Sequence, residues 1–177
     1  MAADSRTRWD YSPEHPLRDA RGYDLGIARP SPRINPNAPG LANLVLSNGG
    51  RFYVDHAHPE FSTPEVADPL DVVIWDKAGE RIAYEATKIL ASLPDSYPVV
   101  LYKNNVDGKG ASYGAHENYL VKRPLDFTLL AQQLMPFFVT RTVYTGAGRV
   151  GIGTTSQDTG FQISQRADYI ETDISLE

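Results

Sequence analysis

The chain has 177 residues, of which 41% are hydrophobic and 22% are charged, and its formal net charge is -5 at pH 7. This composition is typical of one globular domain and unlike that of a disordered chain. The negative charge argues against broad nucleic-acid binding, which depends on neutralising phosphates. The absence of cysteine excludes disulfides, thiol nucleophiles and thiolate metal sites. No apolar run approaches the ~20 residues that cross a bilayer, so we expect a soluble, cytoplasmic protein without a membrane partner.

Residues 1–40 differ in composition from the rest of the chain, because they hold six of the 13 prolines. Each proline fixes φ and removes a backbone hydrogen-bond donor. We therefore divide the chain into a flexible, proline-rich leader at 1–40 and a domain at 41–177. The residues alone leave open whether the leader is merely flexible or is a regulatory or substrate-facing loop.

The domain begins with a predicted β-hairpin. Residues 41–47 and 51–55 are typical of strands, and Asn48-Gly49-Gly50 lies between them. Asn-Gly between apolar runs is a strong signal for a hairpin turn.

A helix is predicted next, from a cap at Asp68 with Pro69 at its first position to an end at Pro94. Its apolar side chains recur at helical spacing. The stripe comprises Leu70, Val73, Ile74, Ala78, Ile82, Ala86 and Ile89.

The second half of the domain is predicted to hold more strands than helices. A helix capped by Asp126 is expected to end or kink at Pro136. The predicted strands are 98–103, 116–123, 161–166 and 168–174, with loops at 104–114 and 146–160. The fold class is therefore α+β, with a largely antiparallel curved sheet and flanking helices.

The segment 51–55 carries the strongest chemical signal. Because side chains alternate along a strand, Arg51, Tyr53 and Asp55 share one face, and Phe52 and Val54 share the other. A guanidinium can bind phosphate, and a carboxylate can bind a metal or act as base or nucleophile. The plainer alternative is a solvent-facing edge strand with a surface Arg–Asp pair.

Acidic and hydroxyl groups come shortly after this strand. Glu60 is an attractive oxygen ligand for magnesium, because hard cations prefer carboxylates. Thr63 and Glu65 add a hydroxyl and a second acid. The histidines at 56 and 58 could ligate a transition metal, but short histidine-containing turns are common.

Polar groups also recur in the second half. The glycine-rich loop before His116 could bring backbone amides close to phosphate, although it lacks the spacing of the known nucleotide-binding loops. Gln162, Ser164 and Arg166 alternate along a predicted strand. At least three polar strand faces together favour a polar sheet that binds a charged ligand.

Several long blocks resemble the family of Pup deamidases/depupylases (Dop) and Pup ligases, within the glutamine-synthetase-like carboxylate–amine ligase superfamily. The DHAHPE segment, the leader RWDYSPEHPLRDARGYDL and the ending YIETDISLE favour the deamidase branch. The blocks are NGGRFYVDHAHPEFSTPEV, DPLDVVIWDKAGERI, LYKNNVDGKGASYGAHENYLVKR, PFFVTRTVYTGAGRVGIG and FQISQRADYIETDISLE.

The resemblance implies a cradle-shaped sheet that holds ATP and Mg²⁺. It also implies hydrolysis of the C-terminal glutamine amide of Pup, a modifier of the proteasome pathway, and of the bond between Pup and protein lysines. Carried over by position, Asp55 is catalytic, and Arg51 and Thr63 contact nucleotide. The metal residues are Tyr53 and Glu60, with His116 a weaker candidate.

The resemblance also has gaps. No counterpart of the family's first metal-binding strand precedes Trp9, and the family continues beyond Glu177. We therefore expect a fragment with a partial cradle, inactive alone, whose partners are Pup, pupylated proteins and the remaining part of the enzyme chain. The alternatives are a Pup–protein ligase and a non-catalytic fragment that binds Pup or a partner.

Overall fold

The computed structural model describes residues 43–94, 96–170, 172 and 174. The chain divides into two compact units, Met1–Tyr102 and Lys103–Glu177, and each is considered by itself. The predicted leader at 1–40 lies outside the described residues.

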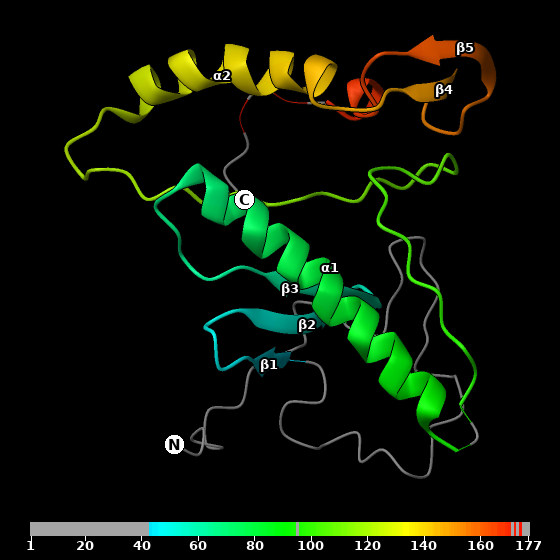
Figure 1. Ribbon diagram of the computed structural model, residues 1–177. Helices are drawn as coiled ribbons and strands as arrows, with labels where there is room; N and C mark the ends of the chain where they lie inside the picture. The colour runs from blue at the N-terminus through cyan, green and yellow to red at the C-terminus, as the bar shows by residue number, and fades with distance from the viewer. Residues whose placement is uncertain (1–42, 95, 171, 173, 175–177) are drawn as a thin grey trace. The chain divides into compact units, whose positions relative to one another are not determined.

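The first unit contains a three-stranded antiparallel sheet (Figure 1), in the order β1 (Asn43–Val45), β2 (Arg51–Asp55) and β3 (His58–Ser62). The predicted first hairpin is confirmed. Its turn is closed by a 2.8 Å hydrogen bond from the Leu46 amide to the Gly50 carbonyl, and Gly49 takes the left-handed conformation with φ of 87°.

Strand β3 was not predicted. It pairs with β2 through a two-residue turn in which His56 and Ala57 have φ of 46° and 64°. Such turns require positive φ at both positions and normally carry Asn-Gly or Asp-Gly. The histidine-alanine pair gives no such signal, so the sequence indicated only a polar turn.

Helix α1 (Pro69–Ser92) confirms the predicted helix start, because the Asp68 side chain accepts a 2.7 Å hydrogen bond from the Leu70 amide. The helix contacts β3 and lies across the sheet in Figure 1. Gly79 is the buried residue of α1. A Cβ atom there would lie 2.3 Å from Cδ1 of Phe61 on β3, so glycine permits the close approach.

The predicted apolar stripe of α1 is covered only in its middle turns. Ala78, Ile82 and Ala86 are half-buried, whereas Leu70 and Ile89 are 65% and 64% exposed. The short sheet reaches only the centre of a 24-residue helix. Among the described residues no hydrophobic side chain is fully buried.

The second unit contains helix α2 (Phe127–Tyr144), capped as predicted by Asp126, whose carboxylate accepts hydrogen bonds from the amides of Thr128 and Leu129. Of the two predicted outcomes at Pro136, an end or a kink, the end is wrong, because α2 continues through Pro136 to Tyr144. One proline removes a single helical hydrogen bond, and the turns on both sides still form.

A second hairpin pairs β4 (Arg149–Ile152) with β5 (Asp158–Gln162), with a register shift between Val150 and Ile152. The predicted loop at 146–160 is therefore wrong at 149–152 and 158–160, which form strands. Gly151, with φ of 93°, marks the irregularity; glycine in a strand commonly marks a bulge.

Three predicted strands are not strands. Residues 98–103 and 116–123 lack ladder pairing, and Ala167–Tyr169 forms a short 3₁₀ helix, after which described residues 170, 172 and 174 are irregular. β-branched and aromatic residues favour a strand only where a neighbouring strand can pair with it. Within the described ranges these segments have no such neighbour.

Helices and antiparallel sheets occur together, which confirms the predicted α+β class. Within the described part of the chain, neither α1 nor α2 is long and apolar enough to span a bilayer.

Candidate active site

The polar face of β2 and β3 consists of residues from both strands that the antiparallel register sets opposite one another. Tyr53 pairs with Glu60, and Asp55 pairs with His58. The Arg51 guanidinium carbon lies 3.8 Å from the centre of the Tyr53 ring, so these two side chains share the face that alternation predicts. We call this set the β2–β3 polar face; its members are Arg51, Tyr53, Asp55, His58, Glu60 and Ser62.

A hydrogen-bonded chain crosses this face. The Tyr53 hydroxyl donates to Glu60 Oε2 at 2.6 Å, and the Ser62 hydroxyl donates to the Tyr53 oxygen at 3.5 Å. Burial raises the pKa of the Tyr53 phenol above its ordinary value of 10.0, and the hydrogen bond to Glu60 adds to the rise. The phenol therefore keeps its proton near neutral pH and orients the Glu60 carboxylate.

Asp55 lies at the end of β2 beside the tight turn. Its Oδ1 atom is 2.5 Å from Nδ1 of His56, and the Asp55 and His56 side chains are 30% and 45% exposed. An ionised carboxylate can only accept, so this hydrogen bond requires the Nδ1–H form of His56 when Asp55 is ionised. The carboxylate is thus held by a neighbour and is still open to a ligand.

Arg51 is oriented by the neighbouring strand, since its Nε donates to Asn43 Oδ1 on β1 at 2.7 Å. Every residue of β2 is half-buried. The β2–β3 polar face is therefore not covered completely by apolar side chains. A guanidinium, a phenol and carboxylates lie on the same face of one sheet.

The remaining predicted site residues are not members of the β2–β3 polar face. Thr63 is exposed and comes directly after the last residue of β3, so it lies beyond the paired strand. His116 belongs to the second unit and is exposed. Sequence reasoning missed Asn43 and Ser62, and it considered His56 only as a possible metal ligand. The cross-strand register, which places Ser62 opposite Arg51, is the signal that could have found Ser62.

The β2–β3 polar face offers too few ligands to enclose a hard cation without other oxygen donors. Within the described ranges no group of three or more His, Asp or Glu residues could hold a metal ion. Mg²⁺, however, is commonly held by one or two carboxylates together with water and substrate phosphates. Glu60 supplies such a carboxylate, and Arg51 a donor for phosphate, so the residues fit a magnesium nucleotide held mainly by its own oxygens.

Of the polar residues predicted to alternate on 161–166, only Gln162 lies in a strand, and it contacts a buried arginine. Arg149 on β4 is 8% exposed and pairs with Asp168. Its Nη2 also donates to Gln162 Oε1 at 3.0 Å and to the Gly153 carbonyl at 2.9 Å. Ser164 is 7% exposed, so this residue of the predicted ligand-binding face is buried.

Comparisons with known proteins identify the family of the chain. The family described as Pup-ligase protein matches residues 1–177. The chain belongs to this family. A Pup deamidase/depupylase of Mycobacterium tuberculosis (strain CDC 1551 / Oshkosh) is 58% identical over 173 residues, and a depupylase of Acidothermus cellulolyticus is 54% identical over 176. These matches cover 97% and 99% of this chain.

More distant similarity extends to ligases. A Pup–protein ligase of Bifidobacterium adolescentis is 42% identical over 75% of this chain. The solved structure of the Pup ligase PafA in complex with ADP matches with a TM-score of 0.60 and 40% identity, over 73% of this chain and 29% of that one. The resemblance inferred from the sequence blocks is thereby confirmed.

The chain spans about a third of the length of the curated relatives that it matches, 34% of the Mycobacterium protein and 35% of the Acidothermus protein. Membership of the family therefore does not by itself give this chain the activity of the full-length relatives.

Proposed function

We propose that this chain forms part of an ATP- and Mg²⁺-dependent amidohydrolase that deamidates the C-terminal glutamine of Pup and cleaves Pup–lysine isopeptide bonds. The single observation that carries the proposal is the β2–β3 polar face, with a half-exposed carboxylate, a guanidinium and an oriented glutamate in one cluster. Support comes from relatives of that name that are 58% identical over nearly the whole chain.

Asp55 acts on the amide carbonyl in this proposal, either as nucleophile or by activating a water molecule. The His56 ring, whose Nδ1 lies 2.5 Å from Asp55 Oδ1, holds the Asp55 carboxylate in one orientation. Arg51, held by Asn43, supplies positive charge where oxyanions develop or phosphates bind.

Glu60 and Tyr53 would hold Mg²⁺, and Arg51 and Thr63 would contact ATP, with His116 as a further metal candidate. Bound magnesium supplies charge neutralisation for the phosphates and polarises oxygen ligands. The hydrogen bond from Tyr53 limits the orientations of Glu60, which favours binding because fewer side-chain rotamers are lost.

The proposed partners are Pup, pupylated proteins and the remaining part of the enzyme, in the cytoplasm. Many large apolar side chains are exposed on the described residues, including Leu70 and Ile89 on α1 and Phe137 on α2. Exposed apolar surface of this extent is typical of surfaces that another segment covers. We therefore expect the 177-residue chain to have little or no activity alone.

A Pup–protein ligase is the second candidate, favoured by the match to the ADP-bound Pup ligase at 40% identity. In that reaction Asp55 would act as a base on the target lysine.

The experiment combines this chain with the segment of the Mycobacterium relative that it does not match. Pup ending in glutamine, offered with ATP and Mg²⁺, should lose its terminal amide as ammonia, measured by mass spectrometry. Conjugation of Pup ending in glutamate to an acceptor protein, without deamidation, would instead support the ligase. Magnesium-ATP binding with neither reaction would support a non-catalytic module.

A further inference from the structure

The carboxylate of Asp55 is held at one of its two oxygens. Oδ1 lies 2.5 Å from Nδ1 of His56, and no described residue donates a hydrogen bond to Oδ2. The Asp55 side chain is 30% exposed. A hydrogen bond to an ionised carboxylate is stronger than one between neutral groups. The His56 ring therefore limits the rotation of the carboxylate, while Oδ2 can still meet a ligand.

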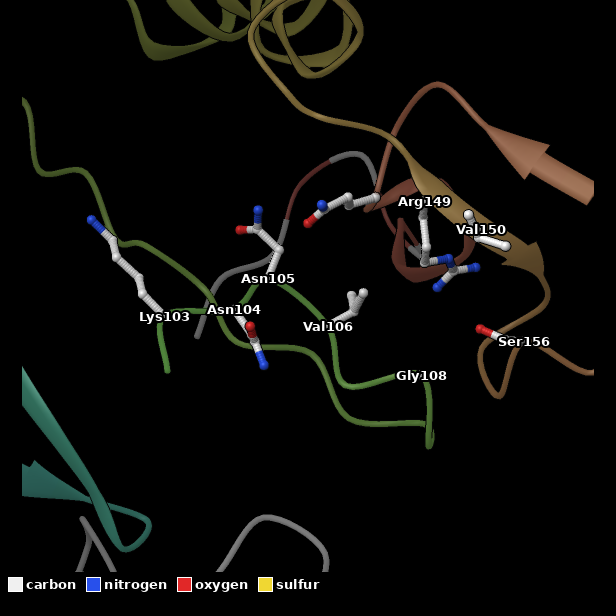
Figure 2. A pocket seen from close by; sticks show the side chains of 9 residues that line it. Lys103, Asn104, Asn105, Val106, Gly108, Arg149, Val150 and Ser156 are labelled. Atoms are coloured by element: carbon white, nitrogen blue, oxygen red, sulfur yellow. The ribbon is translucent and has the colours of Figure 1, made fainter. Parts of the chain in front are cut away.

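A carboxylate of the second unit shows the opposite arrangement. Asp168 Oδ1 accepts a hydrogen bond from Gln162 Nε2 at 3.2 Å, and Oδ2 accepts from the same nitrogen at 3.0 Å and from Arg149. Arg149 lines a pocket of that unit (Figure 2), but both oxygens of its carboxylate partner accept hydrogen bonds. Asp168 is thus bound by the fold itself, whereas Asp55 keeps one oxygen for a ligand.

The turn that brings His56 to Asp55 has an unusual sequence. His56 and Ala57 have φ of 46° and 64°, and a two-residue turn with positive φ at both positions favours Asn-Gly or Asp-Gly. A residue other than glycine pays about 1–2 kcal/mol for this conformation. Residues held in such conformations cluster at functional sites. Conformational preference alone would favour asparagine at position 56, whereas the contact with Asp55 accounts for a histidine.

We propose that His56 is a positioning residue for the reaction, and that it acts through its Nδ1–H donor rather than through proton transfer by the imidazole. By fixing Oδ1, the hydrogen bond sets the direction in which Oδ2 meets the substrate, whether Asp55 attacks the carbonyl or activates water. A misplacement of about 1 Å can cost ~100-fold in rate. This inference rests on the proposed function, because it requires Asp55 to act on the amide.

The test compares two substitutions that both suit positive φ but differ in the donor. Asparagine favours this turn and carries an amide nitrogen one bond from Cγ, as Nδ1 of histidine is. Glycine also favours positive φ and has no side chain. The variants are made in this chain combined with the segment of the Mycobacterium relative that it does not match.

His56→Gly should lower kcat for ammonia release from glutamine-ended Pup by about 10–100-fold, and His56→Asn should recover most of that loss. Magnesium-ATP affinity, measured by calorimetry, should be unchanged in both variants, because the donor acts on Asp55 and not on the nucleotide. Full activity of His56→Gly overturns the proposal. A His56→Asn variant as slow as His56→Gly also overturns it, because the imidazole itself would then be required.

Ala57→Gly is the matched control. It changes the neighbouring position of the same turn and leaves the donor in place, so kcat should not change. A loss as large as that of His56→Gly would assign the effect to the flexibility of the turn and would overturn the proposal.

A spectroscopic measurement separates this inference from the proposed function. In the unsubstituted enzyme at neutral pH, the ¹⁵N NMR signal of His56 Nδ1 should be that of a nitrogen that carries a hydrogen. An Nδ1 without hydrogen contradicts the hydrogen bond to Asp55 and overturns this inference alone. If Nδ1 carries a hydrogen but the unsubstituted enzyme releases no ammonia, the proposed function is wrong, and the positioning role fails with it.

Discussion

The two hairpins of this chain place an arginine in opposite settings. On β2, Arg51 is half-buried and stacks on Tyr53, and its Nε donates to Asn43 on the neighbouring strand β1. On β4, Arg149 is 8% exposed and is held by Asp168, which lies outside the hairpin. The first arrangement leaves carboxylates open to a ligand, whereas the second uses a carboxylate to secure the fold.

The difference shows what a strand pattern does and does not specify. Alternation along β2 suffices to align Arg51 with Tyr53, because both lie on one strand. The setting of Arg149 depends on the 3₁₀ helix Ala167–Tyr169, which carries Asp168 to the hairpin. In the proposed function a carboxylate of the first hairpin binds a ligand, whereas Asp168 pairs with a buried arginine of the second. Removing each should therefore have different consequences.

Asp168→Asn should have the largest effect on stability. It removes the charge partner of a buried guanidinium, and breaking such a pair costs about 3–5 kcal/mol. Urea unfolding followed by circular dichroism measures the loss. Asp158→Asn, at an exposed carboxylate of the same hairpin, is the control. If both changes lower the free energy of unfolding by the same small amount, Asp168 has no structural role.

Glu60→Gln should act on ligand binding rather than on stability. Loss of the carboxylate should weaken magnesium-dependent ATP binding by about 100-fold, as measured by calorimetry in the chain combined with the rest of the enzyme. Glu65→Gln removes the same charge at an exposed position beyond β3 and should leave affinity unchanged. If both variants bind equally well, Glu60 is not a metal ligand.

Gly79→Ala tests the packing of α1 against strand β3, which carries part of the β2–β3 polar face. Alanine normally stabilises a helix relative to glycine by about 1 kcal/mol, yet the new Cβ would lie 2.3 Å from Phe61 Cδ1. Overpacking should win, with a net loss of about 1–3 kcal/mol in the free energy of unfolding. Gly79→Ala combined with Phe61→Leu should recover part of this loss, and a stabilising Gly79→Ala would show that the contact is absent.

The exposed charges on α1 should give the smallest effect. A hydrogen bond from Lys88, followed in importance by the charges of Lys88 and Arg81, lowers the pKa of the Glu85 carboxyl below its ordinary value of 4.5. A lowered folded pKa means that the stabilisation is present above the unfolded value and is lost as pH falls through the folded one.

An NMR titration of the Glu85 side chain should therefore show a midpoint below 4.5. Lys88→Met should raise the midpoint more than Arg81→Met. An equal or larger rise with Arg81→Met would contradict the assigned order of causes, and the shift should shrink at high salt because the pair is exposed.

Local signals predicted much of the first unit. Asp68 before Pro69 gave the helix start, and alternation gave the shared face of Arg51 and Tyr53. Strand β3 was missed because His56 and Ala57 adopt positive φ without glycine or asparagine. The same local reasoning failed for β4, since its glycines are typical of loops as well as of bulged strands.

Non-local contacts account for the other misses. The segment 98–103 has the composition of a strand but has no described partner to pair with, and composition cannot supply one. Ser62 became part of the polar face only through its register opposite Arg51. The hydrogen bond from Tyr53 to Glu60 likewise depends on a turn that local patterns did not reveal.

The sharpest test of the β2–β3 polar face is Asp55→Asn in the chain combined with the rest of the enzyme. Release of ammonia from glutamine-ended Pup should fall by about 10²–10⁴-fold, while calorimetry shows magnesium-ATP binding close to that of the unsubstituted protein. Undiminished ammonia release by the variant would contradict the proposed role of Asp55, because the half-exposed carboxylate beside His56 would then have no part in the chemistry.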